Sequence, residues 1–213
     1  DDAKRFLEAI KGDRHEALYR VGVSVGLRQG EAFALRWQDV DFEAGTLSVR
    51  HTLHKYKGGW DLQSPKTERS RRTINLPPTC LSVLAAHKTR SEFERVAAGE
   101  EWQEHGFVFT SSIGTPLDGP NVIKQLHAIL KKTGLPIIRF HDLRHTCATL
   151  LLVQGVEARR VMELLGHSSI TVTLNIYSHV IPALKKETAL QMEAILNPTT
   201  DKITDKVEFS LLN

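Results

Sequence analysis

The chain has 213 residues, enough for one sizeable domain or two small ones, and its composition is that of a soluble globular protein. Its formal net charge of +3 permits nucleic-acid binding without requiring it. Two distant cysteines exclude a disulfide framework, no stretch is long and apolar enough for a membrane span, and the first residues lack a signal-peptide pattern, so we expect a protein of a reducing cytoplasm.

Helices are predicted for the first part of the chain. Apolar residues recur at helical spacing in residues 1–12 and 13–26, and residues 27–42 predict a turn followed by a short helix. After Gly45 the hydrophobic period changes to that of strands. Three strands of a small antiparallel meander are predicted, over residues 46–56, 60–65 and 71–77.

The helical pattern returns after Pro77 and Pro78. It covers residues 79–99, 119–134, 140–155, 157–167, 168–180 and 182–196. The sequence therefore predicts an α+β fold that is mainly α, with one small three-stranded antiparallel sheet. We expect residues 1–196 to form a single domain and residues 197–213 to form a tail, polar at first and apolar near its end.

The segment RFHDLRHT, residues 139–146, places His141, Arg144 and His145 on one face of a predicted helix. The two histidines have the spacing of a zincin helix, so a zinc-dependent hydrolase is one alternative. Asp142 stands where a zincin has Glu, Arg144 would set a cation beside the metal ion, and no third ligand is evident. A metal-free phosphate site fits better, because the arginine fork matches phosphate oxygens and fixed donors stabilise the charge developing on them.

Four segments carry a resemblance to a known family: GLRQGEAFALRW, KTERSRRTINLP, HDLRHTCATLL and LLGHSSITVTLNIYSHV. They resemble the four catalytic segments of the tyrosine recombinases, also called the phage integrase family, and they occur in the family's order. The resemblance extends from the first helix to about residue 196. It implies the helical catalytic-domain fold of that family. The core-binding and arm-binding domains that precede this domain in full-length relatives are expected to be absent.

The resemblance implies a catalytic set in which no position departs from the family's pattern: Arg28, Lys66, His141, Arg144, His167 and Tyr177. Tyr177 would attack a DNA phosphodiester, giving a 3′-phosphotyrosyl link, and the two arginines would bind the non-bridging oxygens. Lys66 would be the general acid for the leaving 5′-oxygen. The histidines would bind the phosphate or transfer the tyrosine proton, and Glu31 would orient Arg28. Strand exchange and religation would then need no metal, cofactor or ATP.

Basic residues in and around the predicted strands are expected to bind the DNA backbone: Lys55, Lys57, Arg69, Arg71 and Arg72. We therefore expect a site-specific recombinase or integrase of a phage or mobile element, acting on DNA in the cytoplasm of a bacterium or phage host. Its expected partners are double-stranded DNA with a specific attachment site, other protomers in a synaptic tetramer, and accessory DNA-bending proteins. A non-cutting DNA-binding regulator and a type IB topoisomerase are the alternatives. The tail is expected to dock either in cis or onto a neighbouring protomer.

Overall fold

The structure is a computed structural model that describes residues 2–65, 70–176, 190, 192–193 and 195–197. It divides into two compact units, residues 1–174 and 175–213. The catalytic tyrosine, lysine and one basic residue predicted from the sequence, Tyr177, Lys66 and Arg69, lie outside the described residues, as does the tail over residues 198–213.

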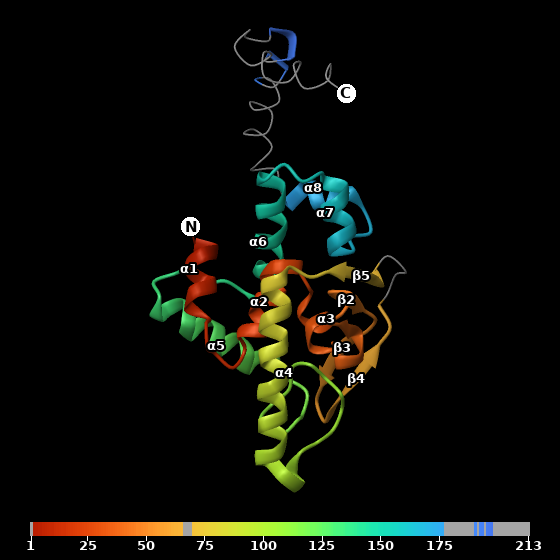
Figure 1. The fold of residues 1–213 in the computed structure, drawn as a ribbon, viewed down its shortest axis with the longest axis vertical. Coiled ribbons are helices and arrows are strands. Elements are labelled where there is room, and N and C mark those ends of the chain that lie inside the picture. The colour runs from red at the N-terminus through yellow and green to blue at the C-terminus, as the bar shows by residue number, and fades with distance from the viewer. Residues whose placement is uncertain (1, 66–69, 177–189, 191, 194, 198–213) are drawn as a thin grey trace, which may run out of the picture. The chain divides into compact units, whose positions relative to one another are not determined.

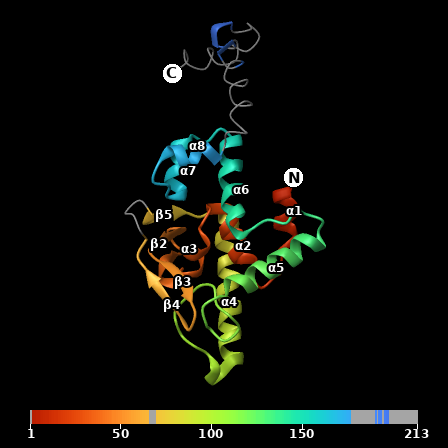
Figure 2. The same cartoon turned by 180° about the vertical axis from the view of Figure 1, so that it is seen from behind.

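Helices form most of this unit and confirm the predicted fold class (Figure 1). They are α1 (Asp2–Ala9), α2 (Glu16–Val25), α3 (Gln29–Phe33), α4 (Pro78–Ala98), α5 (Gly119–Lys132), α6 (Phe140–Val153), α7 (Ala158–Leu165) and α8 (Ile170–Ile176), which crosses the unit boundary, with 3-10 turns η1 (Trp37–Asp39) and η3 (Gly99–Glu101). Helix α2 packs against both α4 and α6 and is buried along most of its length. Figures 1 and 2 show α1 and α5 on one side of α2 and α4, with the strands on the other. Every helix in the described part of the chain is too short or too polar to span a bilayer.

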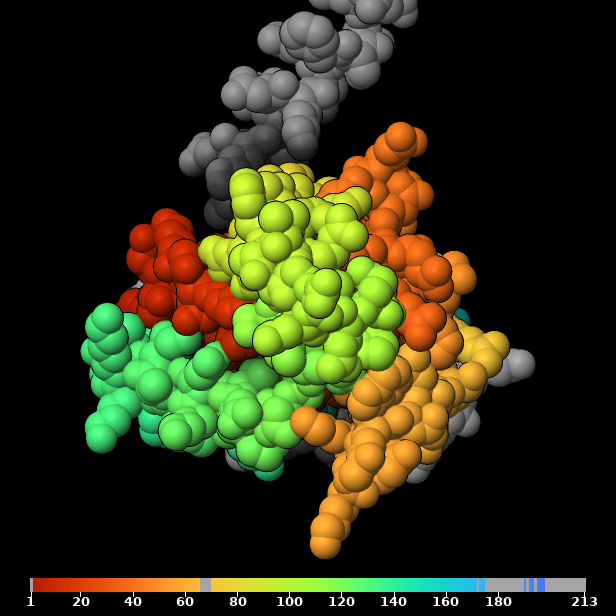
Figure 3. Space-filling model, turned by 90° about the horizontal axis from the view of Figure 1, so that it is seen from below, coloured from red at the N-terminus to blue at the C-terminus, as the bar shows by residue number. Residues whose placement is uncertain are grey.

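The strands form two sheets. One contains β1 (Val40–Asp41), β2 (Thr46–Val49) and β5 (Arg72–Asn75) in the order β1-β2-β5, and the other pairs β3 (Thr52–Tyr56) with β4 (Gly59–Gln63). All pairings are antiparallel. Figure 3 shows the light-orange segment that contains the β3–β4 hairpin projecting from the body of the unit.

The predicted meander is wrong, although a three-stranded antiparallel sheet is present. Residues 46–56 form two strands in different sheets, and β2 pairs with β5 rather than with the hairpin. Leu47, Val49 and Leu53 are all buried, so the alternation of apolar residues continues through the break after Val49. The hydrophobic period alone therefore cannot show that the chain changes sheets there.

A glycine in the first motif is explained by the contact between α3 and β3. A Cβ added at Gly30 would lie 2.6 Å from Thr52 Cγ2 and 3.1 Å from the carbonyl oxygen of Leu53. A side chain at this position would push the hairpin away from α3. Gly30 thus allows the start of α3 to lie directly against the second sheet.

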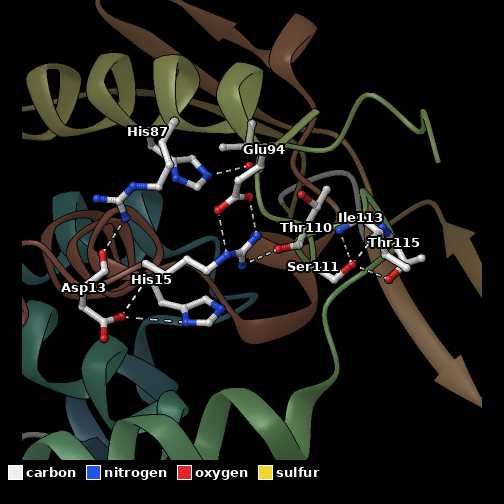
Figure 4. A network of polar contacts seen from close by, with 11 residues as sticks. Asp13, His15, His87, Glu94, Thr110, Ser111, Ile113 and Thr115 are labelled. Carbon is white, nitrogen blue, oxygen red and sulfur yellow. Dashed lines mark hydrogen bonds and ion pairs between the residues drawn. The ribbon is translucent and has the colours of Figure 1, made fainter. Parts of the chain in front are cut away.

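A network of polar contacts joins α4 to the loop before α2 and to the segment around Thr110 (Figure 4). Arg14 donates to both carboxylate oxygens of Glu94, at 2.9 and 2.6 Å, and to the carbonyl oxygen of Thr110 at 2.7 Å. Arg90 donates to the carbonyl oxygen of Asp13 at 2.9 Å. We call these contacts the Arg14–Glu94 network. Its bidentate ion pair holds α4 in place beside α2.

Candidate active site

The C-terminus of α7 presents three backbone carbonyl groups to the rest of the unit. The helix ends at Gly166 in the left-handed conformation, with φ +65°, and the amides of Gly166 and His167 bond back to the carbonyl oxygens of Glu163 and Met162, both at 3.1 Å. The carbonyl groups of Leu164, Leu165 and Gly166 come at the end of this turn. A helix C-terminus carries partial negative charge, so these oxygens attract cations.

Three arginines bind these three consecutive carbonyl oxygens. Arg72 Nε donates to Leu164 at 2.6 Å, Arg144 Nη2 to Leu165 at 2.7 Å, and Arg28 Nη2 to Gly166 at 3.3 Å. Arg72 lies at the start of β5, Arg144 within α6 and Arg28 immediately before α3. We call these three residues the arginine cluster. The last turn of α7 therefore brings together cations from three separate parts of the sequence.

Arg144 is the most deeply buried member of the cluster, with 2% of its surface exposed. Its Nη1 donates to the carbonyl oxygen of Gly26 at 2.7 Å. Burial, together with the charges of Arg28 and Arg72, lowers the pKa of Arg144 to about 9, which still leaves the guanidinium protonated at neutral pH. A Cβ at Gly26 would collide with Leu165 Cδ2, and the φ of +66° at this residue also favours glycine. The glycine that ends α2 thus makes room for α7 and Arg144.

Among the described residues, Glu31 is the carboxylate that pairs with the arginine cluster. It is 3% exposed, and it accepts from the backbone amide of Arg28 at 3.0 Å, from Arg28 Nη1 at 2.7 Å and from Arg72 Nη2 at 3.0 Å. Burial raises the pKa of Glu31, but the charges and hydrogen bonds of Arg72 and Arg28 outweigh it, and the net shift is downward. Glu31 is therefore ionised, and it caps α3 while holding two of the three guanidinium groups.

His167 directly follows Gly166, whose carbonyl oxygen accepts from Arg28, and so lies beside the arginine cluster. The residue is buried, and its Nδ1 lies 2.9 Å from the hydroxyl oxygen of Thr173, which is itself fully buried. Desolvation, and then the charges of Arg144, Arg28 and Arg72, lower the pKa of His167 to about 4. The imidazole is therefore neutral at neutral pH, and it adds a hydrogen-bonding group to the site without adding charge.

The two histidines of the HDLRH motif contact each other on α6. Their rings meet edge to face with centroids 4.6 Å apart. Desolvation is the main cause that lowers the pKa of both His141 and His145. His145 Nδ1 is buried without a hydrogen-bond partner, and the described residues contain no group of three His, Cys, Asp or Glu side chains that could hold a metal ion.

The predicted DNA-contacting residues differ in their surroundings. Lys57 and Arg71 are exposed, whereas Lys55 pairs with Asp118 at 2.7 Å. The side chain of Arg72 is only 7% exposed and belongs to the arginine cluster. The alternation of side chains along a strand could have predicted this difference. Arg72 lies on the same face of β5 as the buried residue Ile74, whereas Arg71, one residue before the strand, lies on the opposite face. The sequence-based grouping of Arg71 with Arg72 overlooked that alternation.

Comparison with known proteins places this chain in one family. The model of the phage integrase family matches residues 1–183. A tyrosine recombinase XerC-like protein of Caldanaerobacter subterraneus is 40% identical over 197 residues, covering 87% of this chain and 50% of the relative. An integrase of Streptomyces ambofaciens is 34% identical, covering 91% of this chain and 51% of the relative. The chain thus spans about half the length of the curated relatives that it matches.

Solved structures give the same result. The Tn1549 transposon integrase, in complex with transposon right end DNA, matches with a TM-score of 0.75 and 25% identity over 89% of this chain and 64% of that one. The XerA recombinase matches with a TM-score of 0.67 and 26% identity over 93% of this chain and 62% of that one. These likenesses confirm the mainly helical fold with small antiparallel sheets. By sequence and by fold, the chain belongs to the phage integrase family.

Proposed function

We propose that residues 1–196 form the DNA breaking and rejoining domain of a site-specific recombinase or integrase. One observation carries the proposal: three guanidinium groups are gathered on consecutive carbonyl oxygens next to a neutral histidine, and among the described residues they are paired with one carboxylate, which two of them share. The excess positive charge suits a phosphodiester, whose non-bridging oxygens gain charge during attack. Because these donors are fixed before the substrate arrives, little reorganisation is needed in the transition state.

The reaction is a transesterification at phosphorus. The phenol oxygen of Tyr177 forms a bond to the phosphorus atom while the bond to the 5′-oxygen breaks. The phenol proton leaves to a base, and Lys66 gives a proton to the departing 5′-oxygen. The products are a 3′-phosphotyrosyl link and a free 5′-hydroxyl, so the bond energy is kept and the 5′-hydroxyl of another strand can reverse the step. Both residues lie outside the described part of the chain, so these two roles rest on family membership.

The geometry of the described residues supports the remaining roles in this proposal. Arg28 and Arg144 bind the two non-bridging oxygens, with Glu31 orienting Arg28. With the hydroxyl of Thr173 donating to Nδ1 of His167, the proton of that ring is on Nε2, from which it can donate to the phosphate. His141, in the first turn of α6, is exposed and can accept the proton of Tyr177 because its pKa is lowered and its ring is neutral.

The partner that this site requires is double-stranded DNA with a specific attachment site. Structures similar to this chain include the Tn1549 integrase bound to DNA and the XerH recombinase bound to its difH substrate. Lys55, Lys57, Arg69 and Arg71 contact the DNA backbone in this proposal and add salt-dependent affinity. The proposal also includes a tetramer of protomers in the synapse, docking by the tail, and accessory DNA-bending proteins. It places the reaction in the cytoplasm of a bacterium or phage host.

Trapping the covalent intermediate tests the proposal. The 213-residue chain is incubated, with EDTA present, with labelled duplexes that carry a randomised centre and a nick beside it. Cleavage next to the nick releases a short fragment, so religation fails and a protein–DNA adduct accumulates on a denaturing gel. We expect an adduct for the wild type and none for Tyr177→Phe. Sequencing the trapped DNA identifies the preferred site.

Other outcomes distinguish the alternatives. Binding without any adduct would overturn the proposal in favour of a non-cutting regulator. An adduct that persists in Tyr177→Phe would refute the assignment of the nucleophile, and cleavage that disappears with EDTA would favour a metal-dependent hydrolase. Adducts at unrelated sequences, accompanied by relaxation of supercoiled plasmid, would indicate a topoisomerase.

A further inference from the structure

We propose that Arg72 is a positioning residue, which fixes Glu31 and the C-terminus of α7 so that Arg28 and His167 face the scissile phosphate correctly. The inference rests on the proposed function, since it concerns the same phosphate site. It replaces the expectation that Arg72 contacts the DNA backbone. The contacts, the burial and the place of Arg72 in the chain support it independently.

The contacts of Arg72 involve three separate segments. Its Nε donates to the carbonyl oxygen of Leu164 at 2.6 Å, and its Nη2 donates to Glu31 at 3.0 Å. Its Nη1 donates to the carbonyl oxygen of Ser70 at 3.1 Å and lies 3.4 Å from the other oxygen of Glu31. All three nitrogens of the guanidinium are therefore used within the protein. A planar fork with fixed donor directions suits this task, which a single ammonium group could not fulfil.

Burial separates Arg72 from its neighbour in sequence. The side chain of Arg72 is 7% exposed and points to the face of β5 that carries the buried side chain of Ile74. Arg71 is exposed, and its Nη2 donates to the hydroxyl of Ser64 at 3.3 Å. Of this adjacent pair, only Arg71 has a side chain accessible to a DNA backbone in this structure. The pair therefore offers a natural comparison between a positioning arginine and a DNA-contacting arginine.

Arg72 influences the phosphate site by two routes. Through Glu31 it fixes the carboxylate that orients the guanidinium of Arg28. Through Leu164 it holds the last turn of α7, where Gly166 accepts from Arg28 and is followed directly by His167. Without Arg72, Glu31 would lose one of its two cations and the carbonyl group of Leu164 would lose its donor. A shift of about 1 Å in catalytic groups is enough to slow a reaction by about 100-fold.

The place of Arg72 in the chain adds a third consequence. Ser70 is the first described residue after the segment 66–69, which carries the predicted acid Lys66. The bond from Arg72 to the carbonyl oxygen of Ser70 joins Ser70 to Glu31 and α7 through one guanidinium group. Arg72 therefore connects the start of β5 with the groups that are proposed to bind the phosphate.

The test separates the rate of cleavage from the affinity for DNA. Arg72→Gln and wild type are compared on the nicked duplex selected above, measuring adduct formation at saturating DNA, the Kd, and the dependence of Kd on salt. We expect Arg72→Gln to form the adduct about 10- to 100-fold more slowly at saturation, with Kd within about 3-fold and an unchanged salt slope. Arg71→Gln, the matched variant, is expected to weaken binding and to lower the salt slope by about 1.

A variant that forms the adduct slowly because it is unfolded must be distinguished from a folded variant whose catalytic groups are misplaced. Arg72→Lys keeps a cation beside Glu31, and circular dichroism with thermal unfolding establishes which variants are folded at the assay temperature. We expect Arg72→Lys to bind DNA normally and to stay slower than wild type, because lysine cannot make all three sets of contacts. The double variant Arg72→Gln/Glu31→Gln should lose less of the rate of adduct formation than the product of the two single fold-losses, since both residues act on Arg28.

The inference is overturned if Arg72→Gln lowers affinity and salt slope while its rate at saturation equals that of wild type. It is also overturned if the losses from Arg72→Gln and Glu31→Gln multiply fully. Absence of an adduct for the wild-type chain would instead contradict the proposed function, so the two failures are distinguishable.

Discussion

The Arg14–Glu94 network and the arginine cluster are built from the same groups and differ in their charge balance. In the network, Arg14 has both oxygens of Glu94 to itself and donates its remaining contact to a backbone carbonyl group. In the cluster, Glu31 is shared by Arg28 and Arg72, and the hydrogen bonds of Arg144 go to the carbonyl oxygens of Gly26 and Leu165. Among the described residues, the cluster therefore holds three cations against one carboxylate.

The partners of the arginines distinguish a structural ion pair from a site suited to an anion. A buried arginine must be hydrogen-bonded, and both regions meet that need. Carbonyl oxygens satisfy the donors without neutralising the charge, whereas a carboxylate does both. The cluster thus keeps a net positive charge, as the proposed phosphate site requires, and the network does not.

The largest effect is expected for Arg144→Lys. A lysine can replace the charge, but it cannot bond to the carbonyl oxygens of Gly26 and Leu165 together while it faces a phosphate. We expect adduct formation at saturating DNA to fall about 100- to 1000-fold, the range found when one fixed donor to a developing oxyanion is removed. Arg14→Lys, at a temperature where both variants are folded, is the control. Similar losses in the two variants would show that the contrast between the regions is false.

The second effect concerns stability. Glu94→Gln removes the charge that faces Arg14 in a partly buried pair, with side chains 29% and 21% exposed. We expect the free energy of unfolding to fall by about 1–3 kcal/mol, measured by urea denaturation, because the guanidinium keeps its place without a counter-charge. The adduct rate of the folded variant should match that of wild type. A slower rate at full folding would mean that the network also serves the site.

The third effect is a pH dependence that His167 brings to the folded state. Its pKa in the folded protein is about 4, below the ordinary value of 6.5. Between these two pH values the unfolded chain therefore binds more protons than the folded protein does. The stability that it contributes is complete above pH 6.5 and is lost as the pH falls through about 4. His167→Asn should flatten the fall in unfolding free energy over that interval, measured by urea denaturation at several pH values.

The pKa of His167 should also respond to a bound anion. A phosphate bound beside the cluster offsets the charges of Arg144, Arg28 and Arg72, so the pKa of His167 should rise on binding DNA. His87, beside the Arg14–Glu94 network, also has a lowered pKa, chiefly from burial, and it should not respond. Histidine ring resonances followed by NMR titration measure both. Equal responses of the two rings would contradict a phosphate site at the cluster.

The smallest effect is expected outside both regions. Lys57 is exposed next to the tip of the β3–β4 hairpin, and Lys57→Ala should lower the salt slope of DNA binding by about 1 with little change in adduct formation at saturation. Lys88, whose ammonium group lies 5.8 Å from the ring centre of Trp37, is the control, and Lys88→Ala should leave the slope unchanged. An equal change in both variants would indicate a general charge effect.

Much of the fold was predictable, because helical periodicity is a local property. The helices α4, α5 and α6 fall within one or two residues of their predicted bounds, since proline at their starts or glycine after their ends marks them. The sheet was predicted less well. Strand pairing depends on residues far apart in sequence, so the partner of β2 could not be found from its own alternation.

The candidate site shows the same division. The spacing of HDLRHT predicted a phosphate site, and the resemblance of GLRQGE and LLGHSS to the family's segments added Arg28 and His167 to it. Capping also follows from spacing, since Glu31 and Asp142 each stand three residues after the arginine whose amide they accept. Nothing in the motifs indicated that the carbonyl oxygens of α7 would hold the arginines.

Residue identity and local spacing are enough to show which side chains are available, which face of each helix is apolar, and to which family the chain belongs. The convergence of the arginines on the last turn of α7, the sharing of Glu31, and the burial of Arg72 beside an exposed Arg71 depend on tertiary packing. The orphan carbonyl groups at a helix end must find donors, and packing determines which donors reach them.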